Sequence, residues 1–554
     1  MPATTNTTAV VKYLFWIFVC AYGALFLWHP SFAPTDDFVF VQTLQAGKPI
    51  LYYASDFPYY DTAKIGRFTP LAAMEYNFAL IFTSHPSPAW YYAIHALQLL
   101  LVTVALVSVL KRVTPRHGLG YLAIAVFMFT PGFAYSWFRM QLNERDLVLF
   151  LALYLWAYFS YLGDRKSTWP LVLAWFAANF VLYYKETAFI IVGAISFSYL
   201  VLGWKEKDRR LKVFHAACLA SAILYLVIYT LYILPHGGVF SYARGESDFF
   251  IRLLKNVLNY ALVSDPVIIL LVFPLAGYRL FGIVSGRDKP HLIHDPLLAA
   301  ATAFVCAYFV LNLQGIYYFQ PAYVLALPPL FMFLPALLRS VAWRGLAILC
   351  LALLVLNVLP TGLHYVTYYK YMPYNFERTI EYVSRDIDAR RGTSPPSVFL
   401  DGVNRGTGKF MYFIYSEFFR LHGLRDQQYD MKSNVETDVV KEGYFPFLEK
   451  VPTPFTVFKT GPLPQPRAGD YLIVSSQSTD SEKSPEREEH LQSLKQDFDL
   501  VFATDSRFAF PFLNLKNMGR YLLARGAAPG ERFLTISRHK PALESPDYYV
   551  FVKR

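Results

Sequence analysis

Long apolar segments separated by short polar turns dominate the first two thirds of the chain. An α-helix of about 20 apolar residues is long enough to cross the ~30 Å hydrocarbon core of a membrane. The pattern predicts about eleven such spans, and therefore a mainly α, polytopic transmembrane helical bundle. The predicted spans are residues 10–28, 89–110, 118–135, 147–162, 168–184, 187–203, 211–234, 266–284, 296–313, 321–338 and 343–363.

The composition agrees with a membrane protein. Hydrophobic residues make up 55% of the 554 residues, and charged residues only 16%, against about 25% in an average soluble domain. The chain carries 51 basic and 40 acidic side chains, and nearly all of the basic excess lies before residue 376. The excess therefore reflects membrane topology and the lipid bilayer, and we expect no nucleic-acid partner.

Basic residues cluster after every even-numbered predicted span. Short loops rich in Lys and Arg stay on the cytoplasmic side of a membrane. With an odd number of spans, the N-terminus is predicted to be cytoplasmic and the C-terminus to lie outside. No small-residue cleavage site follows Leu27-Trp28-His29-Pro30, so the first span is expected to remain as a signal anchor. The basic residues are Lys111, Arg112, Arg116, Arg165, Lys166, Lys205, Lys207, Arg209, Arg210, Lys212, Arg287, Lys289, Arg339 and Arg344.

Two domains are predicted: a membrane domain at 1–370 and an exported, soluble α/β domain at 371–554. A helical pattern in FERTIEYVSRDIDARR and strand patterns in SVFL, DYLIV, DLVFA and DYYVFVK support the second domain. The membrane domain has two long outer loops, 29–88 and 235–263, each with a stretch expected to lie in the membrane interface.

Cysteines and glycosylation sequons suggest a compartment. All four cysteines (Cys20, Cys218, Cys306 and Cys350) fall inside predicted spans, so the exported domain folds without disulfides. The one Asn-x-Ser/Thr sequon, at Asn6, is on the predicted cytoplasmic side. These features favour a bacterial inner membrane, with the exported domain in the periplasm.

A pair of carboxylates, Asp36 and Asp37, follows the first predicted span. Such a pair beside the outer leaflet can serve as a general base, as a ligand for a divalent metal, or as both. Capping of a helix N-terminus is an equally good interpretation of Pro34-Thr35-Asp36-Asp37-Phe38.

Further charged residues are predicted to face the same side. Two cations, Lys64 and Arg67, lie in the first outer loop. Solvated salt bridges and snorkelling side chains are the alternative explanation for such residues. That alternative is weakest for Lys185 and Glu186, since a charged pair in so short a turn between two spans is costly unless it faces the protein interior. Between the third and fourth spans stand Arg139, Glu144, Arg145 and Asp146.

Cations and carboxylates that face one leaflet suit a reaction on a lipid phosphate. Lys or Arg can hold the anionic oxygens, and a carboxylate can take the proton of an attacking hydroxyl. A phosphate leaving group is a weak base, so cations stabilise its departure and no separate general acid is needed.

This order of loops and spans resembles the C-type glycosyltransferase superfamily, polytopic enzymes that use polyprenyl-phosphate sugars as donors. The resemblance rests on Asp36-Asp37, on the acidic segment Glu144-Arg145-Asp146, and on Tyr184-Lys185-Glu186-Thr187-Ala188, which looks like the Lys-Glu motif of protein O-mannosyltransferases. The segment 317–323 is similar to the aromatic-then-proline entry to a late span in relatives of lipid A aminoarabinose transferases. There an Arg or His usually accompanies the tyrosine, whereas this chain has Gln314 and Gln320.

The resemblance implies a role for each candidate residue. Asp36 or Asp37 would be the catalytic base, and Glu144 or Asp146 would assist it or position the acceptor. Transfer would proceed with inversion at the anomeric carbon. The chain lacks the Trp-Trp-Asp motif of the oligosaccharyltransferases, which favours transfer of a single sugar without an essential metal. The residues expected to bind the donor phosphate or the substrate are Lys185, Glu186, Arg67, Arg139, Arg145 and Tyr318.

Three other functions compete with this hypothesis. A transporter or flippase of lipid-linked glycans usually places charges near the bilayer midplane and shows two related halves. A polymerase of lipid-linked glycans would use similar cations. An acyltransferase would need an intramembrane histidine, for which His95 and His215 are candidates, although isolated histidines are more often packed than catalytic. The exported domain is expected to cover the catalytic cavity and to select the acceptor.

Overall fold

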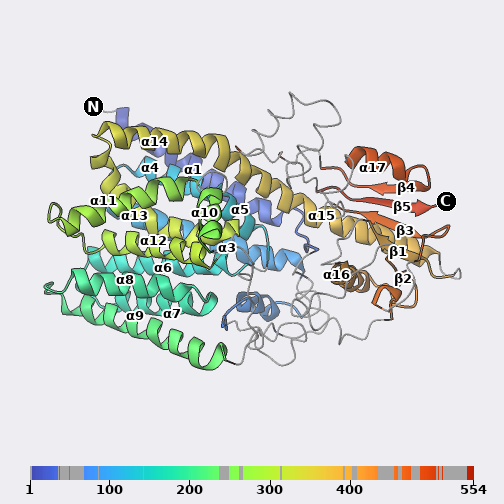
Figure 1. The fold of residues 1–554 in the computed structure, drawn as a ribbon, viewed down its shortest axis with the longest axis horizontal. Helices are drawn as coiled ribbons and strands as arrows, with labels where there is room; N and C mark the ends of the chain where they lie inside the picture. Colours follow the sequence, from blue (N-terminus) through green and yellow to red (C-terminus); the bar gives the residue numbers. More distant parts are fainter. Residues whose placement is uncertain are drawn as a thin grey trace. The chain divides into compact units, whose positions relative to one another are not determined.

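Helices make up most of the described chain, with one small mixed sheet near its C-terminal end (Figure 1). The computed structural model describes residues 3–34, 37, 49, 68–84, 87–140, 142–235, 249–260, 266–311, 315–390, 394–401, 408–433, 454–458, 464–475, 487–506, 510, 515 and 546–554. The chain divides into two units. The first comprises Met1–Trp28, Leu51–Tyr76 and Tyr91–Leu363, and the second comprises His29–Ile50, Asn77–Trp90 and His364–Arg554.

The first unit is a bundle of apolar helices. Its α-helices are α1 (Ala3–Leu27), α3 (Pro88–Val113), α4 (His117–Met128), α5 (Pro131–Trp137), α6 (Glu144–Gly163), α7 (Trp169–Tyr184), α8 (Ala188–Leu202), α9 (Arg209–Ile228), α10 (Phe249–Asn259), α11 (Phe273–Val284), α12 (His294–Val310), α13 (Gln320–Leu337) and α14 (Val341–Leu353). Its short 3₁₀ or π segments are η2 (Tyr229–Ile233), η4 (Ile268–Val272), η5 (Ile316–Phe319) and η6 (Leu354–Val358). The segment η1 (Met74–Ile81) belongs to the first unit up to Tyr76 and to the second unit from Asn77. The long helix α15 (Leu359–Ala389) begins in the first unit.

Ten of the eleven predicted spans coincide with a continuous apolar helical segment of the structure, and the predicted span 118–135 covers the two helices α4 and α5. Among the described residues, six helices are long and apolar enough to cross a membrane, and the pair α4–α5, bent by 63°, makes a seventh if it is one span. The protein is therefore an integral membrane protein. A total of eleven spans requires that four shorter apolar helices also cross, namely Trp169–Tyr184, Ala188–Leu202, Ile268–Val284 and His294–Val310.

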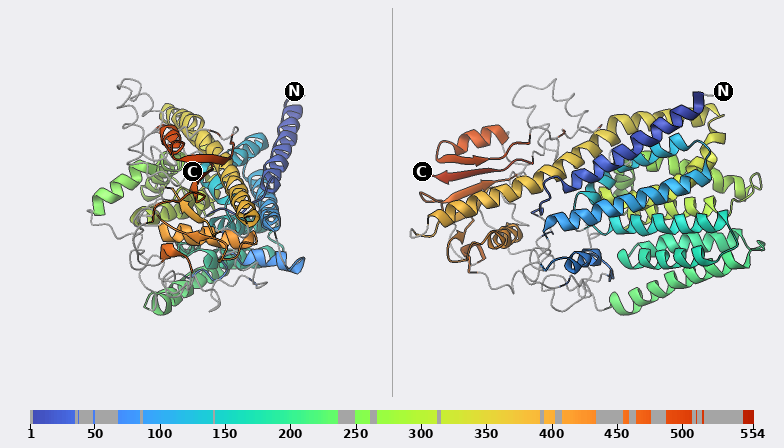
Figure 2. Two further views of the ribbon diagram at one scale, coloured as in Figure 1. Left: turned by 90° about the vertical axis from the view of Figure 1, so that its right-hand side faces the viewer. Right: turned by 180° about the vertical axis from the view of Figure 1, so that it is seen from behind.

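Neighbouring helices of the bundle pack through small and aromatic side chains. Helix α6 contacts α7 and α13, while α8 contacts α9 and α12; the teal and green helices α6–α9 run side by side in Figures 1 and 2. Buried Ala174, Ala177 and Ala178 line the interior face of α7, and such small residues let helix backbones approach closely. The bend between α4 and α5 lies at Thr130, where Pro131 begins the next helix.

Apolar side chains also cover the outer surface of the bundle. On α3, Leu97, Leu101 and Val104 are exposed, whereas Leu99 and Leu106 are buried. A helix that is apolar on both faces matches a lipid environment better than water. The stretch of the outer loop 29–88 that is expected at the membrane interface contains η1, and that of the loop 235–263 contains α10. The depth of both stretches in the membrane stays a prediction.

The second unit contains a five-stranded sheet, which confirms the predicted α/β character. The strand order is β2-β1-β3-β5-β4, with β1 parallel to β2 and β3, and with β5 antiparallel to β3 and β4. The strands are β1 (Ser397–Leu400), β2 (Asp430–Met431), β3 (Tyr471–Val474), β4 (Phe498–Ala503) and β5 (Tyr549–Lys553). The helices of this unit are α16 (Gly408–Leu421), the short η8 (Thr456–Phe458), α17 (Arg487–Leu494) and most of α15.

Helices cover both faces of this sheet. Leu491 and Leu494 of α17 pack on a core that includes Leu472 and Val474 of β3. Successive strand residues point to opposite faces, so Tyr471 faces the other side, where its hydroxyl donates a hydrogen bond to Asp386 of α15 (2.5 Å).

The helical prediction for FERTIEYVSRDIDARR is confirmed, but the helix is much longer. Helix α15 begins at Leu359 and ends at Ala389, with Pro373 inside it. It joins the end of the last predicted span to the predicted soluble helix, since no polar linker separates the two patterns. The predicted domain boundary at 370/371 lies within α15, seven residues beyond the division between the two units.

Candidate active site

The centre of the candidate site is a buried ion pair between two helix ends of the first unit. Glu144 opens α6, and Lys185 ends α7 in an extended conformation (φ −151°, ψ 135°) before α8 begins. The Nζ atom of Lys185 lies 2.7 Å from Oε1 of Glu144. Both side chains are buried. The structure thus brings together two of the residues that the sequence singled out.

An aromatic ring lies against the Lys185 ammonium group. Nζ is 5.1 Å from the centre of the Tyr318 ring, which suits a cation–π contact. Tyr318 in turn stacks on Tyr308 of α12, with ring centres 4.5 Å apart. The Tyr308 hydroxyl and Thr187 Oγ1 share a hydrogen bond of 2.8 Å. The Lys185 ammonium group therefore lies against a largely apolar aromatic surface, and such surroundings strengthen its electrostatic interactions.

Tyr318 belongs to a row of tyrosines, Tyr308, Tyr318, Tyr317 and Tyr135, hereafter the tyrosine row. The Tyr317 hydroxyl donates to that of Tyr318 (3.2 Å), and the Tyr317 ring stacks on Tyr135 at 5.1 Å. Arg139 lies over the Tyr135 ring at 4.9 Å and also donates to its hydroxyl.

The tyrosine row links three predicted substrate-binding residues, namely Lys185, Arg139 and Tyr318, which is itself part of the row. Lys185 lies beside Tyr318, and Arg139 lies at the far end beside Tyr135. Lys185 comes from the α7–α8 turn, Tyr318 from η5 and Arg139 from the segment after α5. The two cations, Lys185 and Arg139, thus lie along one row of tyrosine hydroxyls and ring faces.

A second polar cluster surrounds Arg145, one residue after Glu144. The Arg145 guanidinium donates to Gln98 Oε1 (2.7 Å), Glu75 Oε1 (2.8 Å) and the Tyr76 hydroxyl (2.8 Å). Gln98 Nε2 donates to Asp146 Oδ1 (2.7 Å). We call Glu75, Tyr76, Gln98, Arg145 and Asp146 the Arg145 network.

The Arg145 network is closed within the protein. Arg145 is 0% exposed and Asp146 only 1%. The two carboxylates of the cluster, Glu75 and Asp146, both contact the guanidinium, the latter at 3.5 Å. In this geometry Arg145 and Asp146 fix the start of α6, and Glu144 is the residue of that segment that meets Lys185.

Burial changes the titration of Glu75. Desolvation and the nearby Asp146 carboxylate raise the pKa of Glu75 well above its ordinary value, although the Arg145 guanidinium acts in the opposite direction. A carboxyl group in this environment retains its proton to higher pH than a solvated glutamate does.

Asp37 belongs to the second unit and is buried. Its Oδ2 accepts a hydrogen bond of 2.8 Å from the backbone N–H of Ala33. That bond holds one carboxylate oxygen against the backbone four residues earlier in the chain. Asp36 and Arg67 lie outside the described residues, so their predicted roles stay predictions.

Sequence reasoning missed several members of these clusters. Gln98 lies inside a predicted span, where a buried polar residue is itself a signal, and Glu75 lies within the otherwise apolar LAAMEYNFALIF. Tyr308 gave no signal, because a tyrosine in an aromatic-rich span is unremarkable until its neighbours are known. Glu186, next to Lys185, is half-buried.

The two intramembrane histidines are packed in the interior. His95 Nε2 shares a hydrogen bond with the Tyr76 hydroxyl (2.7 Å), and Nδ1 with the Trp137 carbonyl (2.9 Å). His215 stacks on Tyr199 at 4.0 Å and bonds the Tyr158 hydroxyl. Neither arrangement resembles an exposed catalytic base.

Metal ions require sets of several ligating side chains. Over the ranges that the structure describes, no group of three or more His, Cys, Asp or Glu side chains could hold a metal ion; Asp36 is outside those ranges.

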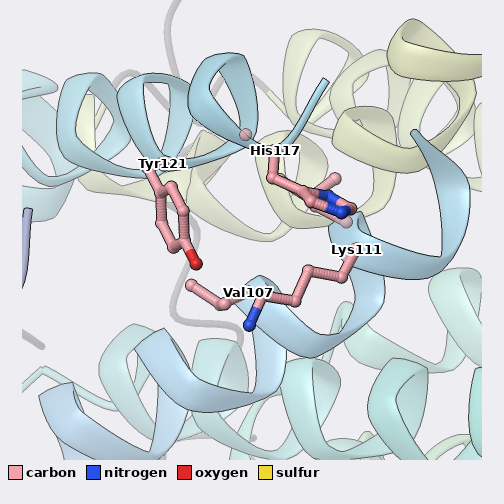
Figure 3. A pocket seen from close by; sticks show the side chains of 6 residues that line it. Val107, Lys111, His117 and Tyr121 are labelled. Atoms are coloured by element: carbon pink, nitrogen blue, oxygen red, sulfur yellow. The ribbon is translucent and has the colours of Figure 1, made fainter. Parts of the chain in front are cut away.

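Figure 3 shows a recess between α3 and α4 whose volume of about 10 Å³ suits one water molecule. The recess is lined by Val107, Leu110, Lys111, His117, Gly120 and Tyr121.

Comparisons with known proteins found similar solved structures only. No family model matches the chain, and no curated protein matches it. ArnT from Cupriavidus metallidurans, bound to undecaprenyl phosphate, is 12% identical, with 90% of this chain and 96% of that chain covered and a TM-score of 0.41. The Archaeoglobus fulgidus oligosaccharyltransferase, in complex with zinc and sulfate, is 11% identical over 97% and 88% of the two chains, with a TM-score of 0.40. The oligosaccharyltransferase AglB of the same organism, with an inhibitory peptide and a dolichol-phosphate, is 12% identical over 98% and 88%, with a TM-score of 0.39.

Proposed function

We propose that this protein is an inverting glycosyltransferase that moves a single sugar from a polyprenyl-phosphate donor to a hydroxyl acceptor. The observation that carries the proposal is the buried Lys185–Glu144 pair at one end of the tyrosine row. The motif resemblance found in the sequence supports the same chemistry. The basic loops support a reaction on the outer face, with the N-terminus cytoplasmic and the C-terminal domain in the periplasm of a bacterium.

Lys185 would hold the donor phosphate. Its ammonium group is a cation with three N–H donors, and it can pair with the anionic oxygens of a phosphate as it pairs with the Glu144 carboxylate. The Glu144 carboxylate balances the positive charge of the lysine in a poorly solvated place. Arg139 and the hydroxyls of the tyrosine row supply further donors, and the ring faces supply surface for the prenyl chain or the sugar.

Asp36 or Asp37 would be the general base. The acceptor hydroxyl attacks the anomeric carbon, its proton passes to the carboxylate, and a new C–O bond forms. The bond from the anomeric carbon to the phosphate oxygen breaks, and the electron pair leaves with the polyprenyl phosphate. A single displacement inverts the anomeric configuration, and the cations stabilise the leaving phosphate.

The Arg145 network would position these groups without touching the substrate. Its hydrogen bonds reach η1 and α3, and thus hold the first turn of α6. Catalysis by oriented groups is sensitive to displacements of about 1 Å. Arg145 and Asp146 are therefore proposed as positioning residues, and Glu144, Glu186 and Tyr318 as residues around the phosphate.

The test is donor turnover by the purified full-length protein in detergent. A panel of polyprenyl-phosphate monosaccharides would be supplied, and the release of polyprenyl phosphate followed with and without EDTA. Losing a general base lowers the rate by about 10² or more, so we expect this loss in Asp36→Asn or in Asp37→Asn. Asp164→Asn, an exposed carboxylate in the α6–α7 turn, is the matched control. Activity that resists EDTA would support a mechanism without an essential metal.

A transporter or flippase is the second candidate, favoured by one observation. Arg145 and two carboxylates are buried at the start of α6, and buried charges in a membrane protein often mark transport pathways. Donor binding without turnover, together with movement of the lipid between leaflets of a vesicle, would favour this candidate. A polymerase would be recognised by products that contain more than one transferred unit.

A further inference from the structure

A groove in the second unit lies between α15 and the edge strand β4. Its volume is about 490 Å³, which falls within the usual range of small-molecule sites, about 300–1,000 Å³. Seven residues line the groove: Arg378, Glu381, Tyr382, Arg385, Asp386, Ala389 and Phe502. None of them has a part in the site described above.

Two stacked aromatic rings form one wall of the groove. Tyr382 of α15 and Phe502 of β4 lie with their ring centres 4.7 Å apart and their planes at 15°. Both side chains are half-buried, so part of each ring remains accessible. The strand is irregular between Leu500 and Phe502, and such a bulge can re-aim a side chain. The Arg378 guanidinium lies 5.7 Å from the Phe502 ring centre.

Charged groups along α15 form the rest of the lining. Arg385 pairs with Glu381 one turn away, and these side chains are 79% and 41% exposed. Asp386 accepts from Arg390 (2.7 Å) and from the Tyr471 hydroxyl (2.5 Å). The lining contains two cations and two carboxylates, so the groove has no net charge to select an anion.

We propose that this groove binds a neutral, hydroxyl-rich glycan that serves as the acceptor; the inference rests on the proposed transferase function. Flat aromatic faces pack against the C–H face of a pyranose ring by burying apolar surface. Guanidinium and carboxylate groups have planar sets of donors and acceptors that match adjacent hydroxyls. An anionic ligand would have to face Glu381 and Asp386, so the charge balance favours a neutral one.

The experiment uses the labelled full-length protein in detergent on an array of immobilised oligosaccharides. The array carries neutral oligosaccharides of glucose, galactose and mannose, and anionic ones that bear sialate or sulfate. We expect binding to neutral members, weakened about tenfold or more in Tyr382→Ala and Phe502→Ala, as for the loss of a central aromatic anchor. Leu500→Ala, an exposed residue of the same strand outside the groove lining, should bind like the wild type.

Glu381→Gln provides a second variant that leaves the aromatic packing intact. It should weaken binding several-fold, because it removes a charged acceptor from an exposed position where folding does not depend on it. Absence of binding to every neutral oligosaccharide, preference for anionic ones, or unchanged binding in all three groove variants would overturn the inference.

Donor turnover measured in the same preparations separates the two proposals. Glycan binding that depends on Tyr382 and Phe502, in a protein that turns over no donor, would sustain the groove and overturn the transferase. Donor turnover without glycan binding would overturn the groove alone. If both hold, Tyr382→Ala should raise the KM for the bound oligosaccharide as acceptor and leave the KM for the donor unchanged.

Discussion

The Nζ atom of Lys185 lies 2.7 Å from Oε1 of Glu144, although the two residues are separated by two whole helices in the sequence. Both groups are largely removed from solvent. An ion pair in such a place costs desolvation energy on both sides and gives little net stability. Its presence at the end of a row of tyrosines is better explained by a requirement for a cation there.

The pair can be tested by a double-mutant cycle. Lys185→Gln or Glu144→Gln alone leaves one buried charge without its partner, which should lower the free energy of unfolding by about 3–5 kcal/mol. The double variant should recover most of that loss, as measured by unfolding in detergent. Donor turnover should stay low in the double variant, because the phosphate has lost the Lys185 cation. A double variant with wild-type turnover would refute the role of Lys185.

Gln98 should matter for stability more than an ordinary glutamine. Gln98→Leu removes the acceptor for Arg145 and the donor for Asp146 at once, and buried groups left without partners cost about 1–3 kcal/mol. Gln492→Leu, at an exposed position of α17, should change stability by no more than about 0.5 kcal/mol. Thermal unfolding of both variants in one detergent would compare them, and equal effects would contradict a structural role for the Arg145 network.

The raised pKa of Glu75 predicts a pH dependence of stability. In the unfolded chain Glu75 titrates near its ordinary value of 4.5, whereas the folded protein holds the proton to higher pH. Between these two pKa values the folded state binds more protons than the unfolded state, so the free energy of unfolding falls as the pH rises. Above the folded-state pKa this contribution is constant.

Glu75→Gln isolates that contribution, since the amide cannot ionise and keeps an acceptor for Arg145. From pH 4.5 upward the variant should lose less stability than the wild type. Melting temperatures measured in one detergent across a pH series provide the comparison. Parallel curves for the two proteins would show that Glu75 has an unperturbed pKa.

Gly132 should be required for the geometry of the tyrosine row. A Cβ atom at this position of α5 would lie 2.8 Å from the carbonyl oxygen of Ile316 and 3.4 Å from Cα of Tyr317. Because these contacts are with backbone, Gly132→Ala should displace η5 and its tyrosines and lower donor turnover, even though alanine favours helix by about 1 kcal/mol. Gly118→Ala, with nothing within 4 Å of the added atom, should leave turnover unchanged. Full turnover in Gly132→Ala would argue against a role for the row.

Much of the secondary structure follows from local patterns. Apolar segments long enough for a membrane became helices at all eleven expected places, because in lipid every backbone polar group must be satisfied within its own segment. SVFL is the strand β1 residue for residue, and DYLIV contains β3. Strand β2, with only two residues, is too short to leave an alternating pattern.

The pairing of side chains could not be obtained from the sequence. Lys185 is adjacent to Glu186, yet the carboxylate at 2.7 Å is that of Glu144. Glu144 and Asp146 appear as one acidic motif, but residues two apart on a helix do not face the same side. One therefore meets Lys185, and the other is enclosed with Arg145 and Gln98.

The sequence by itself determined where helices and strands form and which charged residues stand at helix ends, because those properties depend on neighbours within a few positions of the chain. Only the tertiary structure decided that tyrosines from α5, η5 and α12 would form one row, and that Tyr382 would meet Phe502 across 120 residues. Such contacts arise when packed helices and strands bury their surfaces together, and interiors as dense as crystals allow few alternative arrangements.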